Sequence, residues 1–164
     1  MDWWLSRFER FRGKGVAVDT ELLLLWLVGS LNPELIRQFK HTKRFTPDDF
    51  SLISKIVGAF GGIITTPSVL SEASNWIDHF KASAVRVPLM SVWIRGIAQF
   101  DERYCRSAAL AALDQFQILG LADTSLFEIA GEAVVVTCDA GLVARLAAAQ
   151  RQHIDFRKVR PAGR

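Results

Sequence analysis

The stretch AVVVTCD, residues 133–139, contains the clearest β-strand in this sequence of 164 residues. Three consecutive valines are apolar toward both faces and β-branched, which is typical of a strand buried inside a parallel sheet. The run ends abruptly in a charged residue, Asp139, and Gly141 then permits a turn into a helix. The pattern therefore predicts a strand whose carboxyl end presents an acid.

Two earlier stretches repeat this design. VAVD, residues 16–19, is a short apolar run that ends in Asp19, and IIT, residues 63–65, leads into a proline-started helix that carries Glu72. Residues 118–121 are expected to form a brief strand or a turn, a last strand is predicted at residues 153–159, and the intervening segments have helical spacing. Strands that alternate with helices predict an α/β fold, a three-layer α/β/α sandwich with a central parallel sheet of about five strands.

Length and composition limit the chain to one main domain. Half of the 164 residues are hydrophobic, which suffices for one dry core but not for two ordinary domains. Residues 1–14 are rich in aromatic and basic side chains and predict an amphipathic leader, so the domain is expected to cover residues 15–160. We expect the leader to dock on the domain or on a partner.

Charge and cysteine content indicate the kind of partner and the compartment that suit this chain. Twenty Lys and Arg against seventeen Asp and Glu give a net charge of +3, which mildly favours a polyanionic partner. Only Cys105 and Cys138 are present, without the paired spacing of a zinc site or a disulfide framework, which predicts a cytoplasmic protein. No apolar run is long enough for a membrane span.

Four acids occupy special places in this predicted fold. Asp19 and Asp139 follow strands, Glu72 lies in the helix after residues 63–65, and Asp123 precedes a helix that is expected to run to about Ala130. Ligands of open parallel sheets bind beyond the carboxyl ends of the strands, where these acids would meet and repel one another. Oxygen ligands favour Mg²⁺ or Mn²⁺, which would offset the repulsion and activate water toward a phosphodiester.

The same residues resemble the four motifs of PIN domains, in the same order along the chain. VAVDT at 16–20 resembles the opening strand, TTPSVLSE at 65–72 is similar to the second motif, LGLADTS at 119–125 resembles the third, and VVVTCDAGL at 134–142 resembles the fourth. One position departs from the family, because Glu21 stands where an Asn is common. Glu21 is expected either to add negative charge to the site or to point away from it.

The resemblance implies a Mg²⁺- or Mn²⁺-dependent nuclease, most often a ribonuclease and commonly the VapC-type toxin of a type II toxin–antitoxin pair. Asp19, Glu72, Asp123 and Asp139 would then be catalytic and metal-binding. We expect supporting hydrogen bonds from Thr20, Thr137 and Ser125. RNA is the expected substrate, and an antitoxin and a second copy of the chain are the expected partners.

Blander interpretations compete with this one. Each acid is also an ordinary helix cap or turn residue, and Trp76 is expected in the core or an interface rather than as a base-stacking platform. Thr137 is expected either to pack within its strand or to hold a metal-bound water. Two other functions stay open: a PIN-like RNA-binding or assembly module without catalysis, and a nuclease for structured DNA.

Overall fold

A five-stranded sheet lies at the centre of the structure, a computed structural model that describes residues 3–80 and 83–161. All neighbouring strands are parallel, in the order β3-β2-β1-β4-β5. The strands are β1 (Val16–Val18), β2 (Ile63–Thr65), β3 (Asp101–Glu102), β4 (Val134–Thr137) and β5 (His153–Asp155). Every residue of β1, β2 and β4 is buried, which is why uninterrupted apolar runs predicted these three strands.

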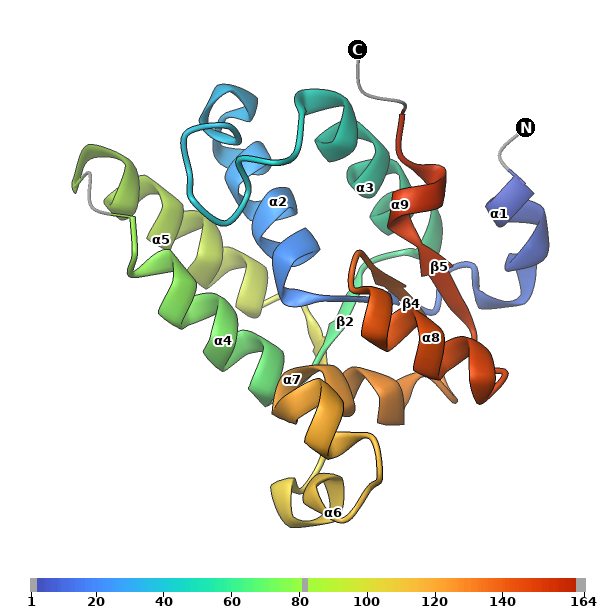
Figure 1. Cartoon of the computed structure of the whole chain (residues 1–164). Coiled ribbons are helices and arrows are strands. Elements are labelled where there is room, and N and C mark those ends of the chain that lie inside the picture. Colours follow the sequence, from blue (N-terminus) through green and yellow to red (C-terminus); the bar gives the residue numbers. More distant parts are fainter. Residues whose placement is uncertain (1–2, 81–82, 162–164) are drawn as a thin grey trace.

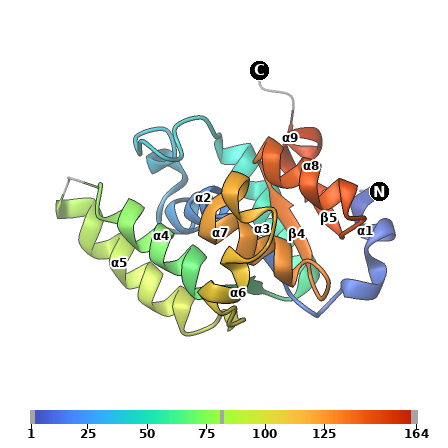
Figure 2. The same cartoon turned by 60° about the horizontal axis from the view of Figure 1, so that its bottom comes forward.

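Helices surround the sheet, and the predicted α/β/α sandwich is confirmed (Figure 1). The helices are α1 (Trp3–Arg7), α2 (Thr20–Leu31), α3 (Pro47–Phe60), α4 (Pro67–Ile77), α5 (Ser83–Ile97), α6 (Ser107–Ala111), α7 (Phe116–Ile129), α8 (Ala140–Ala148) and α9 (Phe156–Val159), with 3-10 turns η1 (Glu9–Phe11) and η2 (Pro33–Leu35). Helix α2 packs on α3, α4 and α5, while α4 packs on α7 and α7 on α8. Figure 2 shows α7 and α8 on the near side of the strands and α3 behind them. None of the described helices has the length and apolar character needed to span a membrane.

Short local signals set where the helices begin. The Thr46 hydroxyl accepts a hydrogen bond from the amide of Asp49, and the Asp49 carboxylate accepts one from the amide of Thr46. This reciprocal capping box and Pro47 fix the start of α3. The Thr66 hydroxyl accepts a single hydrogen bond from the amide of Val69 and caps α4, with Pro67 in the first turn. The predicted entry to the Glu72 helix is thereby confirmed.

The structure differs from the predicted elements in three places. Residues 118–121 form no strand but lie in α7, whose helical course is broken at Gly120 (φ 72°, ψ −174°). The strand that was missed is β3, which consists of two exposed acidic residues at the sheet edge and pairs through its backbone, so no apolar pattern marks it. The last strand stops at Asp155, which caps α9 instead of continuing to residue 159.

The aromatic leader belongs to the same core as the sheet. Trp4, Phe8 and Phe11 are buried, and the Trp4 ring stacks on Phe60 of α3 with 6.3 Å between centroids. Residues 1 and 2 of the predicted leader lie outside the described residues. Within the described part, the apolar face of the leader covers α3, and burial of these rings stabilises the domain.

Candidate functional site

The sheet has a topological switch between β1 and β4. From β1 the chain crosses to β2 and β3 on one side, and then returns to β4 and β5 on the other. Loops leave such neighbours in opposite directions and open a crevice beyond their carboxyl ends. Asp19 follows β1 directly, and Asp139 follows β4 after one intervening residue. Both acids therefore stand at the place where open α/β sheets bind ligands.

Asp19 and Asp139 are also the N-caps of the helices that begin there. Asp19 Oδ1 accepts from the amide of Leu22 (2.8 Å), and Asp139 Oδ1 accepts from the amide of Leu142 (2.7 Å). The amide ends of α2 and α8 thus face these two carboxylates, as is usual for N-cap residues. Capping and ligand binding are compatible roles for both residues.

Glu72 and Asp123 reach the site from two helices that pack on each other, α4 and α7. The sequence predicted that Asp123 caps a helix. In the structure Asp123 instead lies inside α7, just after the break at Gly120. The Ser125 hydroxyl lies 2.6 Å from that of Thr66, the cap of α4. This buried contact fixes the helix of Asp123 against the helix of Glu72.

All four predicted acids line one pocket of about 150 Å³. Its lining consists of Asp19, Thr20, Glu21, Glu72, Trp76, Asp123 and Asp139. The structure therefore brings together side chains from the ends of two strands and from two helices. Their assignment as metal ligands stays a prediction, but their convergence on one pocket is a property of the fold.

Asp19 is the most firmly held of these acids. Besides Leu22, its carboxylate accepts hydrogen bonds at Oδ2 from the Thr137 hydroxyl (2.6 Å) and the Cys138 amide (2.8 Å). Burial nevertheless raises the pKa of Asp19, and the hydrogen bonds oppose this shift. The fold thus supplies donors to a carboxylate that would otherwise be costly to bury.

The three residues predicted to support the acids behave differently. Thr20 donates its hydroxyl to Glu72 Oε2, as a supporting residue should. Thr137 donates to Asp19 and accepts from the amide of Asp139 (2.9 Å), so its hydroxyl supports both of these acids. Ser125 contacts Thr66 and the carbonyl of Ala122, and so acts on the helices rather than on an acid.

Two carboxyl groups of the pocket, those of Asp123 and Glu21, have raised pKa values. Burial, followed by the charges of Asp19, Asp139 and Glu72, raises the pKa of Asp123 from 3.8 to about 7. Burial also raises the pKa of Glu21, and Asp19 and Asp139 add to that shift. A divalent cation would offset the repulsion between these acids, because it offers positive charge to all of them.

Glu21 and Arg44 belong to the site. The sequence left open whether Glu21 faces the site, and it did not identify Arg44 as the partner of Glu21. Glu21 lines the pocket instead of pointing away, and Arg44 forms an ion pair with it. Arg44 also opposes the rise in the pKa of Asp19, so its charge acts on the cluster itself. The position of Glu21 two residues after Asp19 was the only available signal, since Arg44 is distant in the chain.

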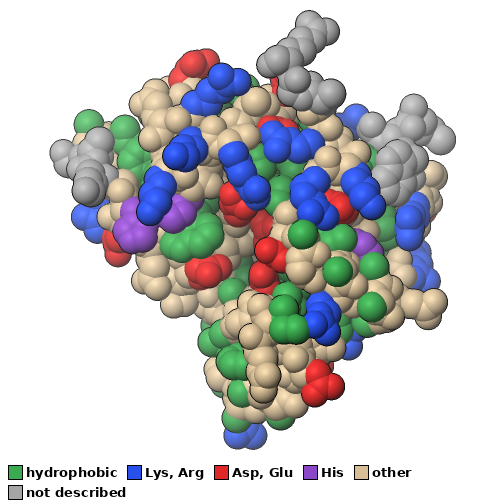
Figure 3. Space-filling model, viewed as in Figure 1, with side chains coloured by type: hydrophobic (Ala, Val, Ile, Leu, Met, Phe, Trp, Pro, Cys, Tyr) green, Lys and Arg blue, Asp and Glu red, His purple; other side chains and the backbone are tan. Residues whose placement is uncertain are grey.

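Basic side chains flank the acids on the face seen in Figure 3. Arg151 is committed to other partners: it donates to the carbonyls of Phe127 and Glu128 and lies over the Phe127 ring. Arg157 is paired with Asp155 through two bonds of 2.8 Å, and Arg160 is paired with the buried Asp49. Arg44 is therefore the cation most closely coupled to the acids.

The donor set fits Mg²⁺ or Mn²⁺ in chemistry but is not arranged as a finished ligand shell. The pocket offers carboxylate and hydroxyl oxygens, the ligands that these ions prefer. Among residues 3–80 and 83–161, no three His, Cys, Asp or Glu side chains are grouped so as to hold a metal ion. Ion binding would therefore require the carboxylates to draw together. The charges of Asp19, Asp139 and Glu72, which add to the effect of burial on the pKa of Asp123, oppose this until a cation enters.

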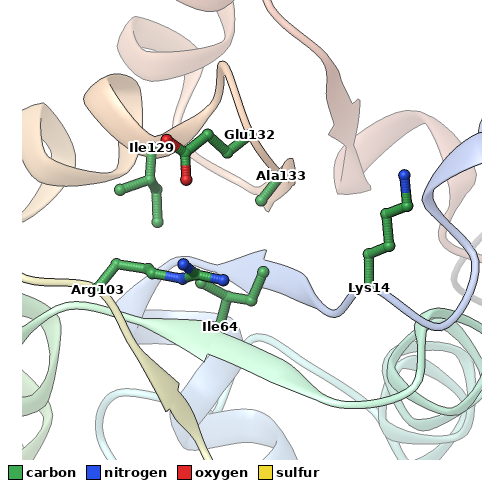
Figure 4. Close-up of a pocket in the computed structure, with 6 residues that line it drawn as sticks. All are labelled: Lys14, Ile64, Arg103, Ile129, Glu132 and Ala133. Carbon is green, nitrogen blue, oxygen red and sulfur yellow. The ribbon is translucent and has the colours of Figure 1, made fainter.

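A larger pocket of about 330 Å³ lies elsewhere (Figure 4). Lys14 and Ala133 stand just before β1 and β4, so this pocket opens near the amino ends of those strands, away from the acids. It holds one acid, Glu132, opposite Arg103. Such a lining lacks the converging carboxylates that would favour a divalent cation.

Comparisons with known proteins do not assign the chain to a family. No protein-family model matches it, and neither the curated proteins nor the solved structures give a match. The case for a function therefore depends on the geometry and chemistry of the acidic pocket.

Proposed function

We propose that the chain is a Mg²⁺- or Mn²⁺-dependent endoribonuclease that hydrolyses RNA phosphodiester bonds. The observation that carries this proposal is the acidic pocket, in which Asp19, Glu72, Asp123 and Asp139 meet at the switch point of the sheet. A cluster of oxygen ligands at this position suits a hard divalent cation. The resemblance of the four surrounding motifs to PIN domains agrees with this chemistry.

The four acids would hold the ion. Bound there, it would polarise a phosphate oxygen and lower the pKa of an attacking water. Asp19 stays fixed by its three hydrogen bonds, and Leu142 orients Asp139 for the ion or the water. Arg44 stands beside the pocket, where its charge would attract the substrate phosphates.

Cleavage of a fluorescent single-stranded RNA in the presence of Mn²⁺ tests the proposal. Asp139→Asn keeps an oxygen for the Leu142 amide, and Asp123→Asn removes only a charge, so both variants should fold. We expect cleavage to fall by roughly 100-fold in each, the scale of losing one electrostatic contact to the transition state. Asp19→Asn is a poorer test, because its amide group would face the donors that now bind the carboxylate.

Asp114→Asn is the matched control, since Asp114 is exposed and is not part of the pocket lining. Unchanged cleavage in the two pocket variants would contradict the proposal. RNA binding without any calorimetric Mn²⁺ binding would instead favour an RNA-binding module, and preference for branched DNA over RNA would favour the DNA nuclease.

The toxin role, the antitoxin, the homodimer and the cytoplasmic location extend this proposal. An antitoxin would act by covering the acidic pocket, and co-expression with the product of a neighbouring small gene tests whether RNA cleavage is suppressed. Light scattering of the purified chain tests for the dimer. Growth arrest on expression of the wild-type chain, but not of Asp139→Asn, would support the toxin role.

A further inference from the structure

An aromatic cluster borders the acidic pocket. Trp76 lies four residues after Glu72 in α4, so both side chains project from the same side of the helix, and both line the pocket. Trp76 is only half-buried, whereas Trp93, a packing tryptophan of α5, is 2% exposed. An indole placed in this way presents apolar surface directly beside the acids.

The indole is held from one side by His41. The two rings are stacked, with centroids 4.4 Å apart and planes 12° from parallel. His41 in turn contacts the edge of the buried Phe39, which stacks on Phe80 at 4.3 Å. This support limits the rotation of Trp76, so a ligand that binds its remaining surface would lose little side-chain entropy.

A second histidine completes the cluster. His41 Nε2 and His79 Nδ1 are 3.1 Å apart, a hydrogen bond in which one ring donates and the other accepts. The two histidines form no cation site with other His, Cys, Asp or Glu side chains among the described residues. Figure 3 shows histidine, hydrophobic and basic side chains adjoining the acids on one face. Among the described residues the cluster is therefore held by ring contacts and one hydrogen bond.

We propose that Trp76, backed by His41, stacks on an unpaired nucleobase of the strand whose phosphate enters the acidic pocket. The inference rests on the proposed function and deepens it, because a stacked base must be free of its partner strand. Every base has an apolar face, so the contact selects single-stranded nucleic acid without selecting a sequence. Trp76 acts as a positioning residue, since it holds the substrate and leaves the chemistry to the acids.

Binding of a labelled single-stranded RNA, followed by fluorescence anisotropy in EDTA, tests this inference apart from cleavage. We expect Trp76→Ala to weaken binding roughly tenfold and Trp76→Phe to weaken it less, as the loss of one stacked base predicts. Tyr104→Ala is the matched control, because Tyr104 is an exposed aromatic residue outside the acidic pocket. Circular dichroism and melting curves establish that each variant is folded.

RNAs with a single abasic site supply the decisive comparison. The abasic site is placed at each position of the RNA in turn. At one position it should weaken binding to the wild-type chain by about as much as the Trp76→Ala substitution does. At that same position it should not change the binding of the Trp76→Ala variant. Equal sensitivity of the two proteins at every position would overturn the inference. If cleavage depends on Asp139 but binding does not depend on Trp76, only the stacking inference is overturned. If binding depends on Trp76 but no cleavage occurs, only the proposed nuclease activity is overturned.

Discussion

The hydroxyl of Thr137 donates a 2.6 Å hydrogen bond to Oδ2 of Asp19, although 118 positions separate the two residues. The bond joins the carboxyl ends of β1 and β4, which pair with Val18 opposite Val136. The same hydroxyl accepts from the Asp139 amide, so one small side chain orients the loops of two acids. The geometry of the pocket thus depends on a residue that is not part of its lining.

Thr137→Val should destabilise the chain, because it replaces the hydroxyl by a methyl group and leaves a buried carboxylate oxygen with one donor fewer. The expected loss in the free energy of unfolding is about 1–3 kcal/mol, measured by urea denaturation. Thr137→Ser retains the hydroxyl and should lose less. Equal stability of Thr137→Val and the wild-type chain would show that the bond contributes little.

Stability without divalent ions should fall as the pH rises toward neutrality. The pKa of Asp123 is about 7 in the folded chain and near 3.8 when unfolded, so the folded state holds its proton more tightly. The favourable contribution is complete below about pH 4 and is lost as the pH rises through about 7. Asp123→Asn should show a flatter profile and exceed the wild-type melting temperature at pH 8 in EDTA. Identical profiles for the two chains would rule out this role of Asp123.

The positive charge of Arg44 should weaken the binding of a divalent cation and strengthen the binding of RNA. Arg44→Gln removes a positive charge next to Glu21 and Asp19, and we expect Mn²⁺ affinity to rise by about 3- to 10-fold, a Coulomb effect near the surface. RNA affinity should decrease in the same variant. Lys43→Gln removes an equal charge from the adjacent exposed residue and is the control for net charge. Calorimetry measures the first effect, and a fall in Mn²⁺ affinity would contradict the prediction.

Two glycine substitutions in helices should have opposite effects. A Cβ at Gly29 would lie 2.2 Å from a ring carbon of Phe50, where α2 packs on α3, and we expect Gly29→Ala to destabilise by roughly 1–3 kcal/mol. A Cβ at Gly58 of α3 meets no atom within 4 Å. Gly58→Ala should therefore stabilise by about 0.5–1 kcal/mol through backbone entropy. Thermal melting compares the two variants. Stabilisation by both substitutions would show that α2 and α3 adjust to the added methyl group at little cost.

Much of the fold was predictable because its signals are local. The apolar runs of β1, β2 and β4 mark strands buried on both faces, and Thr46-Pro47 and Thr66-Pro67 mark helix starts. Residues 118–121 are ambiguous in the sequence, because a short apolar stretch interrupted by Gly120 is consistent with a strand, a turn or part of a helix. The edge strand β3 carries no apolar pattern at all.

The acidic pocket was also predictable only in part. Strand ends that carry acids were visible in the sequence, and the parallel order predicted that Asp19 and Asp139 would share an edge. The pairing of Arg44 with Glu21 and the stacking of His41 on Trp76 were not visible, because they join residues far apart in the chain. No spacing rule links such side chains.

The amino-acid order alone set the buried strands, the helix starts and the acids that stand at their ends, because hydrophobic periodicity and capping depend on near neighbours. Only the folded chain set the direction of Glu21, the place of Asp123 inside α7, and the contact between Thr137 and Asp19. The physical reason is that hydrogen bonds and charges act through space, and the sheet order determines which distant residues come within their reach.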